Sequence, residues 1–249
     1  MASIHLDHVS VQFPIYTANT RSLKKSLMHA TTGGRIGRNA GDRVCVQALD
    51  DVTLSFEHGD RVGLVGHNGA GKTTLLRVIA GIYEPPSGRV DVDGRVAALF
   101  DVALGIDPES TGYENIFLRG LYLGLRPMEI QARIDEITVF SELGDYLAMP
   151  VRTYSTGMLL RLSFAVDTSV EPDILIMDEV ITAGDASFVK KATVRINSLI
   201  DKASIFVIAS HVETVLSEFC NRAIWLDRGA VAADGTVDEV LAAYARARP

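Results

Sequence analysis

The segment from Gly66 to Thr74, GHNGAGKTT, carries the residues best suited to chemistry. Gly66, Gly71, Lys72 and Thr73 fit the spacing G-x-x-x-x-G-K-[ST], between an apolar run and a helical pattern. In such a loop the glycines let consecutive backbone N–H groups turn inward around a nucleotide polyphosphate, whose charge Lys72 and the helix dipole favour. The Thr73 hydroxyl is a ligand for Mg²⁺, and an ordinary glycine-rich turn is the alternative. The residues predicted to contact the nucleotide are His67, Asn68, Gly69, Ala70, Gly71, Lys72, Thr73 and Thr74.

Three further polar residues follow apolar runs that are typical of buried strands. Asp178 and Glu179 end the run ILIMDE, where Asp178 would hold the Mg²⁺ shell and Glu179 would accept a proton from the water that attacks the γ-phosphate. His211 follows SIFVIAS and would reach the γ-phosphate if its strand lies beside that of Asp178. The alternatives are a solvated turn for the two acids and a histidine without a role at a strand end.

A second helix start, in the segment YSTGMLLRLSF, offers another anion site at Ser155 and Gly157. The γ-phosphate of a nucleotide on Lys72 is already well supplied with partners, so this second start suggests a shared site. If two copies of the chain face each other head to tail, the STG helix start of one copy closes over the nucleotide held by the other.

The elements that must position these residues alternate between strands and helices, which indicates a mainly parallel α/β sheet. Strands are expected at residues 4–13, as an edge strand, on both sides of the His58-Gly59 turn, and in DILIMDE and SIFVIASH. RVDVDGRVAALF is predicted to form a hairpin with Asp93-Gly94 at its turn. A helical segment, residues 105–166, interrupts the sheet.

Several local signals refine this outline. RSLKKSLMH, residues 21–29, is predicted to be a short amphipathic helix, and the glycine-rich residues 30–42 a surface loop. Capping boxes are expected at Thr111 and Thr236, each with a Glu three residues later. Pro127 should begin a helix whose apolar face carries Ile130, Ile134 and Ile137.

Composition sets limits on the function. The 249 residues contain 31 acidic and 24 basic side chains, a net charge of −7, so the chain lacks the broad positive surface of a general nucleic-acid binder. Cys45 and Cys220 lie far apart in no ligand spacing, which predicts packing residues in a reducing compartment. No apolar run approaches the roughly 18 residues that span a bilayer, and the N-terminal residues lack the pattern of a signal peptide.

With these motifs together, the sequence resembles an ATP-binding cassette (ABC) ATPase over nearly its whole length. The resemblance rests on GHNGAGKT, YSTGM, ILIMDE, AGDASF and the His of ASH. It implies an α/β P-loop fold with a RecA-like core, an antiparallel β subdomain and a helical subdomain. The expected organisation is a single nucleotide-binding domain over residues 1–249, with the core at about 1–104 and 167–249 and the helical subdomain at about 105–166. It further implies a head-to-tail homodimer that holds two ATP molecules, with Ser155 and Gly157 acting in trans and Asp185 crossing the interface.

The chain departs from the common cassette pattern in three places. In the signature motif LSGGQ, Tyr154, Thr156 and Met158 replace Leu, the first Gly and Gln. Asp101 stands where cassettes usually have a Gln, at the end of the strand that enters the helical region, and it is expected to reach Mg²⁺ or its water in place of that Gln. For the aromatic ring that stacks on adenine, either Tyr16 or Phe13 is possible, and Tyr16 is preferred.

The YSTGM form, TGYENI and the amphipathic segment 21–29 are similar to the ATPases of exporters for O-antigen, teichoic acid and cell-wall galactan. This resemblance implies an ATPase subunit that drives export of a lipid-linked polysaccharide through a transmembrane permease, at the cytoplasmic face of the inner membrane. Since the chain ends soon after DGTVDEVLAAY, we expect no carbohydrate-binding domain after the cassette. The alternatives are a transporter for a lipid, a drug or an imported solute, or a soluble cassette that acts on nucleic acid or ribosomes.

Overall fold

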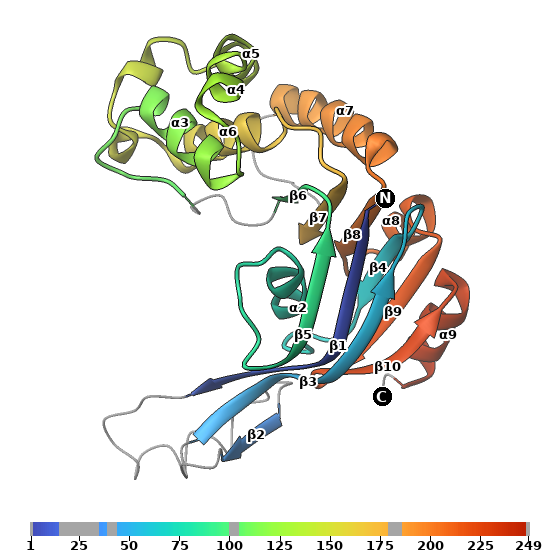
Figure 1. Cartoon of the computed structure of the whole chain (residues 1–249). Helices are drawn as coiled ribbons and strands as arrows, with labels where there is room; N and C mark the ends of the chain where they lie inside the picture. The colour runs from blue at the N-terminus through green and yellow to red at the C-terminus, as the bar shows by residue number, and fades with distance from the viewer. Residues whose placement is uncertain (1, 15–34, 39–43, 100–104, 179–185, 248–249) are drawn as a thin grey trace. The chain divides into compact units, whose positions relative to one another are not determined.

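The computed structural model describes residues 2–14, 35–38, 44–99, 105–178 and 186–247. The chain divides into two compact units (Figure 1). The first unit combines Met1–Gly94 with Ile205–Pro249, and the second unit spans Arg95–Ser204. Predictions for Tyr16, the helix at 21–29, Asp101, Glu179 and Asp185 fall outside the described residues.

The first unit contains a four-stranded antiparallel sheet. In spatial order its strands are β2 (Arg35–Arg38), β3 (Val44–Phe56), β1 (Ser3–Pro14) and β5 (Ser87–Asp93). β1 pairs with β3 on one side and with β5 on the other, so the prediction of an edge strand was wrong. The buried residues Ile4, Leu6, Val9 and Val11 show that one face of β1 is covered, but such alternation does not say how many strands flank it.

β2 lies inside residues 30–42, which were predicted to form a surface loop. Its four residues pair antiparallel with β3, from Arg35 opposite Gln47 to Arg38 opposite Val44. An edge strand needs only one row of backbone hydrogen bonds, so a segment rich in glycine and polar residues can form it. The loop prediction was therefore wrong over these four residues.

The first unit also contains four further strands, of which β4 and β8 are made from buried apolar runs. They are β4 (Arg61–Val65), β8 (Ile205–Ala209), β9 (Arg222–Asp227) and β10 (Ala230–Gly235). β4 pairs in parallel with both β8 and β9, and β10 pairs antiparallel with β9. Parallel pairing brings the carboxyl ends of β4, β8 and β9 to one edge. Among its described residues, this unit contains the helices α2 (Lys72–Ile79), α8 (Glu213–Phe219) and α9 (Val237–Ala247).

The second unit is mainly helical (Figure 1). Its strands β6 (Val96–Leu99) and β7 (Ile174–Asp178) pair in parallel. Its helices are α3 (Gly112–Tyr122), α4 (Pro127–Gln131), α5 (Ile134–Ser141), α6 (Thr156–Asp167) and α7 (Ala186–Lys202), with short 3₁₀ turns at Gly144–Ala148 and Val151–Thr153. Thr111 forms the predicted capping box with Glu114 at the start of α3. Thr236, before α9, donates its backbone N–H and its hydroxyl to Glu239, as expected for the second box.

The predicted hairpin around Asp93-Gly94 does not form. Gly94 has the positive φ expected of a turn, 122°, but β5 pairs with β1, whereas β6 pairs with β7. Arg95 instead exchanges hydrogen bonds with Asp173, accepting from its N–H and donating to its carboxylate. A turn signal alone therefore did not determine which strand each arm would pair with.

The predicted helix from Pro127 is broken in two. The N–H of Arg133 donates to Ile130, three residues back, so the regular four-residue ladder stops between α4 and α5. Ile130 and Ile137 are buried as expected, but Ile134 is only half-buried. The predicted apolar face is therefore confirmed for Ile130 and Ile137 but not fully for Ile134.

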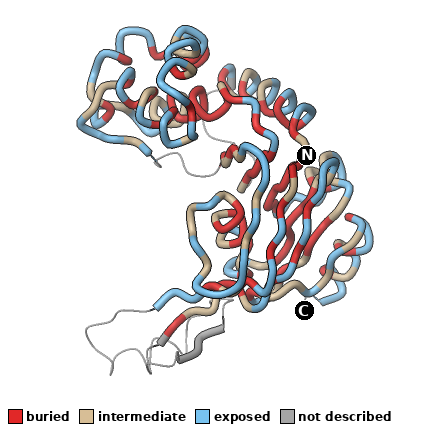
Figure 2. The backbone as a smooth tube through the Cα atoms, in the orientation of Figure 1, coloured by how far each residue is buried: buried red, intermediate tan, exposed pale blue. Residues whose placement is uncertain are grey.

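Figure 2 shows the buried residues concentrated within the strands and along one side of the helices. In the first unit the largest fully buried side chains include Phe56, Phe206 and Leu64. In the second unit Phe140, Phe164 and Phe188 form an aromatic cluster, with ring centroids 5.8 to 5.9 Å apart. These two cores hold in place the loops at the strand ends.

Candidate nucleotide-binding site

The loop after β4 requires glycine at both ends of its motif. Gly66 has a φ of 150° and Gly71 a φ of 109°. A Cβ atom at Gly66 would lie 2.4 Å from the carbonyl oxygen of Leu226, and one at Gly71 would lie 2.5 Å from that of Ala48. Since neither backbone can give way cheaply, only glycine fits this tightly wound loop.

The start of α2 is open to an anion. Gly71 occupies the N-cap position, provides no side-chain hydrogen bond, and is followed by a first turn without an acidic residue. The first N–H groups of the helix are therefore not capped by a side chain, and the positive end of the helix dipole is not neutralised. A glycine-walled loop that ends in such a helix start fits the phosphates of a nucleotide.

Lys72 and His211 are brought together although 139 positions separate them. The Lys72 side chain is buried, and its Nζ donates to the carbonyl oxygens of Gly66 at 2.7 Å and His67 at 3.3 Å. It also lies 3.5 Å from Nε2 of His211, in the loop after β8. Because an ammonium can only donate, this nitrogen of His211 is the accepting one. The structure thus brings together two residues that the sequence analysis assigned to one site.

The turn between β9 and β10 supports the outside of the loop and was missed in the sequence. The N–H of Gly229 donates to Ala70 at 2.9 Å, and Nε2 of His67 lies 3.1 Å from a carboxylate oxygen of Asp227. The N–H of Asp50, in β3, donates in turn to Gly229. The only sequence signal here is a strand followed by Arg-Gly, which predicts a turn but not what the turn contacts.

Three predicted residues lie in the second unit. Asp178 is the last residue of β7 and is partly exposed. Ser155 caps α6, and its Oγ accepts a hydrogen bond of 3.2 Å from the N–H of Met158. Gly157, in the first turn of α6, is exposed. These positions agree with the predicted strand tip and helix start.

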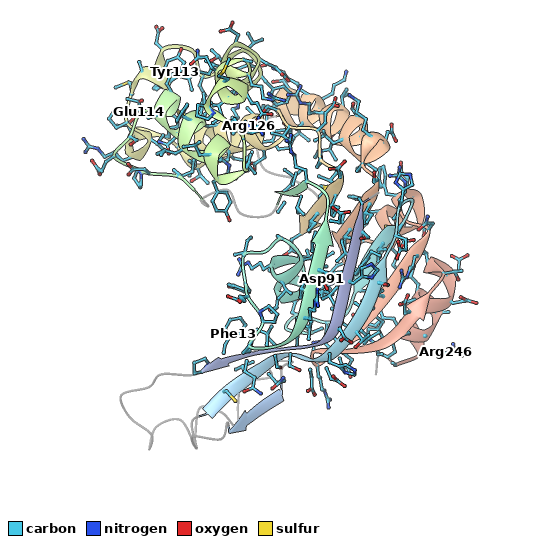
Figure 3. All side chains as sticks on the ribbon, viewed as in Figure 1. Phe13, Asp91, Tyr113, Glu114, Arg126 and Arg246 are labelled. Carbon is cyan, nitrogen blue, oxygen red and sulfur yellow. The ribbon has the colours of Figure 1, made fainter. Side chains whose placement is uncertain are left out.

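Tyr154 explains one departure from the common signature. Its hydroxyl donates to the carbonyl oxygen of Tyr146 at 2.7 Å, and a Cβ atom at Gly112 would lie 2.4 Å from that hydroxyl. Burial, with a smaller contribution from Tyr113, raises the pKa of the Tyr154 phenol and keeps it a neutral donor. Tyr154 thus ties the loop before α6 to the 3₁₀ turn Gly144–Ala148, and its hydroxyl packs against the start of α3, whose residue Tyr113 is labelled in Figure 3.

Phe13, the second candidate for the adenine ring, lies near the end of β1 (Figure 3) and is 39% exposed. Its ring meets the edge of Tyr83 at a centroid distance of 5.5 Å, and Arg77 lies over the other ring at 5.6 Å. The Phe13 ring is therefore packed against Tyr83 on one side but still accessible to solvent on the other.

No group of three or more His, Cys, Asp or Glu side chains within the described ranges is arranged to hold a metal ion. Among the described helices, none combines the length and apolar character needed to cross a bilayer.

The fold and the phosphate loop place this chain in a known family. Residues 49–182 match the ABC transporter family, and the chain belongs to it as an ATP-binding, ATP-hydrolysing cassette. Among solved structures, the fold is similar to that of the dimeric ATP-binding cassette MJ0796 in a post-hydrolysis state bound to ADP and Pi. The TM-score is 0.66 and the sequence identity 19%, and the match covers 94% of this chain and 98% of that one.

Two relatives carry more specific names. The chain is 47% identical to the O-antigen export system ATP-binding protein RfbE of Yersinia enterocolitica, over 93% of this chain and 97% of that protein. It is 41% identical to the O-antigen export system ATP-binding protein RfbB of Myxococcus xanthus, over 91% of this chain but 51% of that longer protein.

Proposed function

We propose that this chain is the ATP-hydrolysing subunit of a transporter that exports a lipid-linked cell-surface polysaccharide of the O-antigen, teichoic acid or galactan type. The observation that carries this proposal is the 47% identity to RfbE along nearly the full length of both proteins, combined with a phosphate loop that has the required geometry. The transmembrane partner is a separate permease, and the cassette works at the cytoplasmic face of the inner membrane.

The proposed division of work at the nucleotide follows from residue chemistry. Lys72 and the N–H groups of the loop bind the phosphates, and His211 contacts the γ-phosphate. Glu179 acts as the base for the attacking water. Mg²⁺ keeps several waters and needs few protein ligands, for which Thr73, Asp178 and Asp101 are the candidates. We assign Asp185 to the dimer interface and Tyr16 to the adenine ring.

The proposed second half of the site comes from a partner copy. Gly157 has an ordinary φ, and a Cβ atom there would meet only Ser155 Oγ, at 3.9 Å. Glycine within a helix costs roughly 0.5–1 kcal/mol relative to Ala, so the fold of this chain gains nothing from it. Because the fold of its own chain does not require Gly157, we infer that this position leaves room for a group from outside the chain. We assign that group to the nucleotide bound by a second cassette.

Replacing Lys72 by Ala tests the cargo. In cells that depend on this chain, we expect the polysaccharide to disappear from the surface and accumulate as a lipid-linked form inside, because phosphate binding falls at least about tenfold. The measurement is polysaccharide on intact cells and in membrane extracts. A matched control is Lys190→Ala on the exposed side of α7, which should leave export unchanged. Normal surface polysaccharide in the Lys72 variant would mean another cargo.

A further inference from the structure

Asn115, near the start of α3, carries a polar side chain that is completely buried. Its Oδ1 accepts from the N–H of Asp107 at 2.7 Å. Its Nδ2 donates to carbonyl oxygens, those of Asp107 at 2.9 Å, Ser110 at 3.1 Å and Thr111 at 2.9 Å. Because a buried amide is costly unless its polar atoms are bonded, these contacts hold the backbone of residues 107–111 in one shape.

The start of α3 does not depend on this amide. Thr111 and Glu114 already cap the helix through a capping box. Asn is a weaker helix former than Ala or Leu, and the amide of Asn115 reaches back to Asp107 and Ser110, which precede the helix. Its hydrogen bonds therefore serve mainly to organise the segment before α3.

Residues 107–112 hold a second segment, residues 149–152, through backbone hydrogen bonds and a β-bridge. The hydrogen bonds run from the N–H of Val151 to Ser110 at 2.9 Å, from Arg152 to Pro108 at 2.8 Å and from Gly112 to Met149 at 3.2 Å, and the bridge pairs Thr111 with Pro150. The backbone of residues 149–152 is therefore set by a segment whose own shape depends on Asn115.

This second segment leads directly to Ser155. Residues Val151–Thr153 form a 3₁₀ turn, and the N–H of Tyr154 donates to Val151 at 2.9 Å. The hydroxyl of Tyr154 donates to the carbonyl oxygen of Tyr146 at 2.7 Å. Ser155 follows as the N-cap of α6. The backbone is thus restrained from residue 149 up to the start of the helix.

We infer that Asn115 and Tyr154 are positioning residues for ATP hydrolysis, because they set the place of Ser155 at the nucleotide held by a partner cassette. The inference rests on the proposed function, in which Ser155 acts in trans. Asn115, Tyr154 and Ser155 belong to the same half of the shared site. Loss of either positioning residue should therefore damage the site that a chain completes for its partner, and not the phosphate loop of the chain itself.

Asn115→Ala should lower the rate of ATP hydrolysis by the full chain about ten- to hundredfold, because a displacement of about 1 Å in a reacting site can cost about 10²-fold. The Kd for ATP, measured with a fluorescent analogue, should stay within about twofold of the wild type, since Lys72 and its loop belong to the first unit. A loss in rate without a loss in affinity is the signature of misplacement.

Tyr154→Phe is a gentler variant of the same kind. It removes the hydroxyl that donates to Tyr146 and keeps the ring. A single hydrogen bond of this type corresponds to about a two- to tenfold change, so hydrolysis should fall by that factor while the Kd for ATP stays the same. Thermal unfolding of each variant verifies that it is folded.

Mixed dimers separate misplacement of Ser155 from general damage to the chain. In a mixture of Asn115→Ala with Lys72→Ala, the intact phosphate loop of the first variant meets the intact helix start of the second. With random pairing, about a quarter of the wild-type rate should return. In a mixture of Asn115→Ala with Ser155→Ala, every site has a defective helix start, so no activity should return. A misfolded Asn115 variant would rescue neither partner.

Gly120→Ala is the matched control in the same helix. Its new methyl group would lie 2.7 Å from a side-chain carbon of Ile130, so it should lower stability. Gly120 lies near the other end of α3, away from residues 107–112, and the folded variant should hydrolyse ATP at the wild-type rate. An equal loss of hydrolysis in Gly120→Ala would attribute the effect to stability and overturn the inference.

Two further results would also overturn it. The first is hydrolysis at the wild-type rate by Asn115→Ala, or by Tyr154→Phe if Asn115→Ala does not fold. The second is a mixture of Asn115→Ala with Lys72→Ala that stays inactive while a mixture of Ser155→Ala with Lys72→Ala recovers. If neither mixture recovers, action of Ser155 in trans is disproved, and the proposed shared site falls together with this inference.

Discussion

At the scale of single residues, the glycines fall into two groups with different causes. Gly66 and Gly71 are required by their own chain, because both have positive φ and backbone atoms occupy the place of a Cβ. Gly157 has neither constraint, since the space beside it is open. Gly120, in α3, has an ordinary φ but is pressed against Ile130, because a Cβ atom at this glycine would lie 2.7 Å from a side-chain carbon of that residue.

Gly157→Ala is therefore expected to leave stability unchanged or raise it by up to about 1 kcal/mol, because Ala is the better helix former. ATP hydrolysis should nevertheless fall at least about tenfold, since a methyl group would obstruct the phosphates of the partner site. Steady-state ATPase assays and thermal unfolding measure the two effects.

Gly120→Ala is a control in which a glycine is required by its own chain, so here the loss should be in stability. Its new methyl group overlaps Ile130, so stability should fall by about 1–3 kcal/mol. If Gly157→Ala hydrolyses ATP at the wild-type rate, close approach at this position is disproved.

Much of the candidate site could be read from spacing, because a loop and the helix that follows it are local in sequence. Lys72 and Ser155 were predicted in this way, and the prediction for His211 depended on a strand that the apolar run made recognisable. Asp227 could not be identified. Its contact with His67 spans 160 positions and depends on the register that sets Val65 opposite Trp225 in β4 and β9.

At the scale of elements, the chain signals where an element begins better than it signals what the element pairs with. The cap at Thr111 is local, since Glu114 accepts from its N–H at 2.7 Å, and it was predicted correctly. The backbone N–H and the side-chain hydroxyl of Thr111 both donate to Glu114, and these hydrogen bonds lower the pKa of its carboxyl group. The segments that pair with β1 and β6 are distant in sequence; β1 was predicted to lie at a sheet edge and β6 to pair with β5, and both predictions were wrong. Hydrogen bonding between strands does not depend on side-chain type, which leaves the choice of partner to the whole fold.

The contact between α3 and α6 includes a buried ion pair that the sequence did not reveal. Arg119 donates from Nε and Nη2 to the two carboxylate oxygens of Asp167, at 2.6 and 2.7 Å. The side chains are only 4% and 8% exposed. Such a bidentate pair fixes the two helices in one register, and it leaves a charge without its partner if either side is removed.

Arg119→Ala should lower the free energy of unfolding by about 3–5 kcal/mol, because the carboxylate of Asp167 stays buried without its partner. The double variant Arg119→Met, Asp167→Leu should recover most of this loss, since apolar side chains of similar size fill the space without a charge. Urea unfolding followed by circular dichroism gives both values.

An exposed pair on β5 provides the comparison. Arg89 and Asp91 are 76% and 52% exposed, so Arg89→Ala should change stability by less than about 1 kcal/mol. A loss for Arg119→Ala as small as that for Arg89→Ala would contradict the structural role assigned to the buried pair.

At the scale of the whole molecule, the predicted contacts to the nucleotide are distributed over both units. Lys72 and His211 belong to the first unit, and Asp178 and Ser155 belong to the second. The sequence predicted the class of fold because strands and helices alternate along the chain. It also supplied a second helix start that one nucleotide does not need, and this surplus is the reason for proposing a head-to-tail pair of chains.

That pairing is tested by mixing two inactive variants, Ser155→Ala and Lys72→Ala. Each alone should hydrolyse ATP at least about tenfold more slowly than the wild type. In a mixed dimer, the intact phosphate loop of the Ser155 variant meets the intact helix start of the Lys72 variant, so one of the two sites is complete. With random pairing, half of the dimers are mixed, and about a quarter of the wild-type rate should return if the sites act independently.

A second mixture serves as the control. Lys72→Ala combined with a chain that carries both substitutions contains no intact phosphate loop, and it should remain inactive. If Ser155 instead served the nucleotide of its own chain, no chain in the first mixture would have both residues, and that mixture would also remain inactive. Recovery in the first mixture but not in the second therefore requires Ser155 to act on the nucleotide of a partner chain.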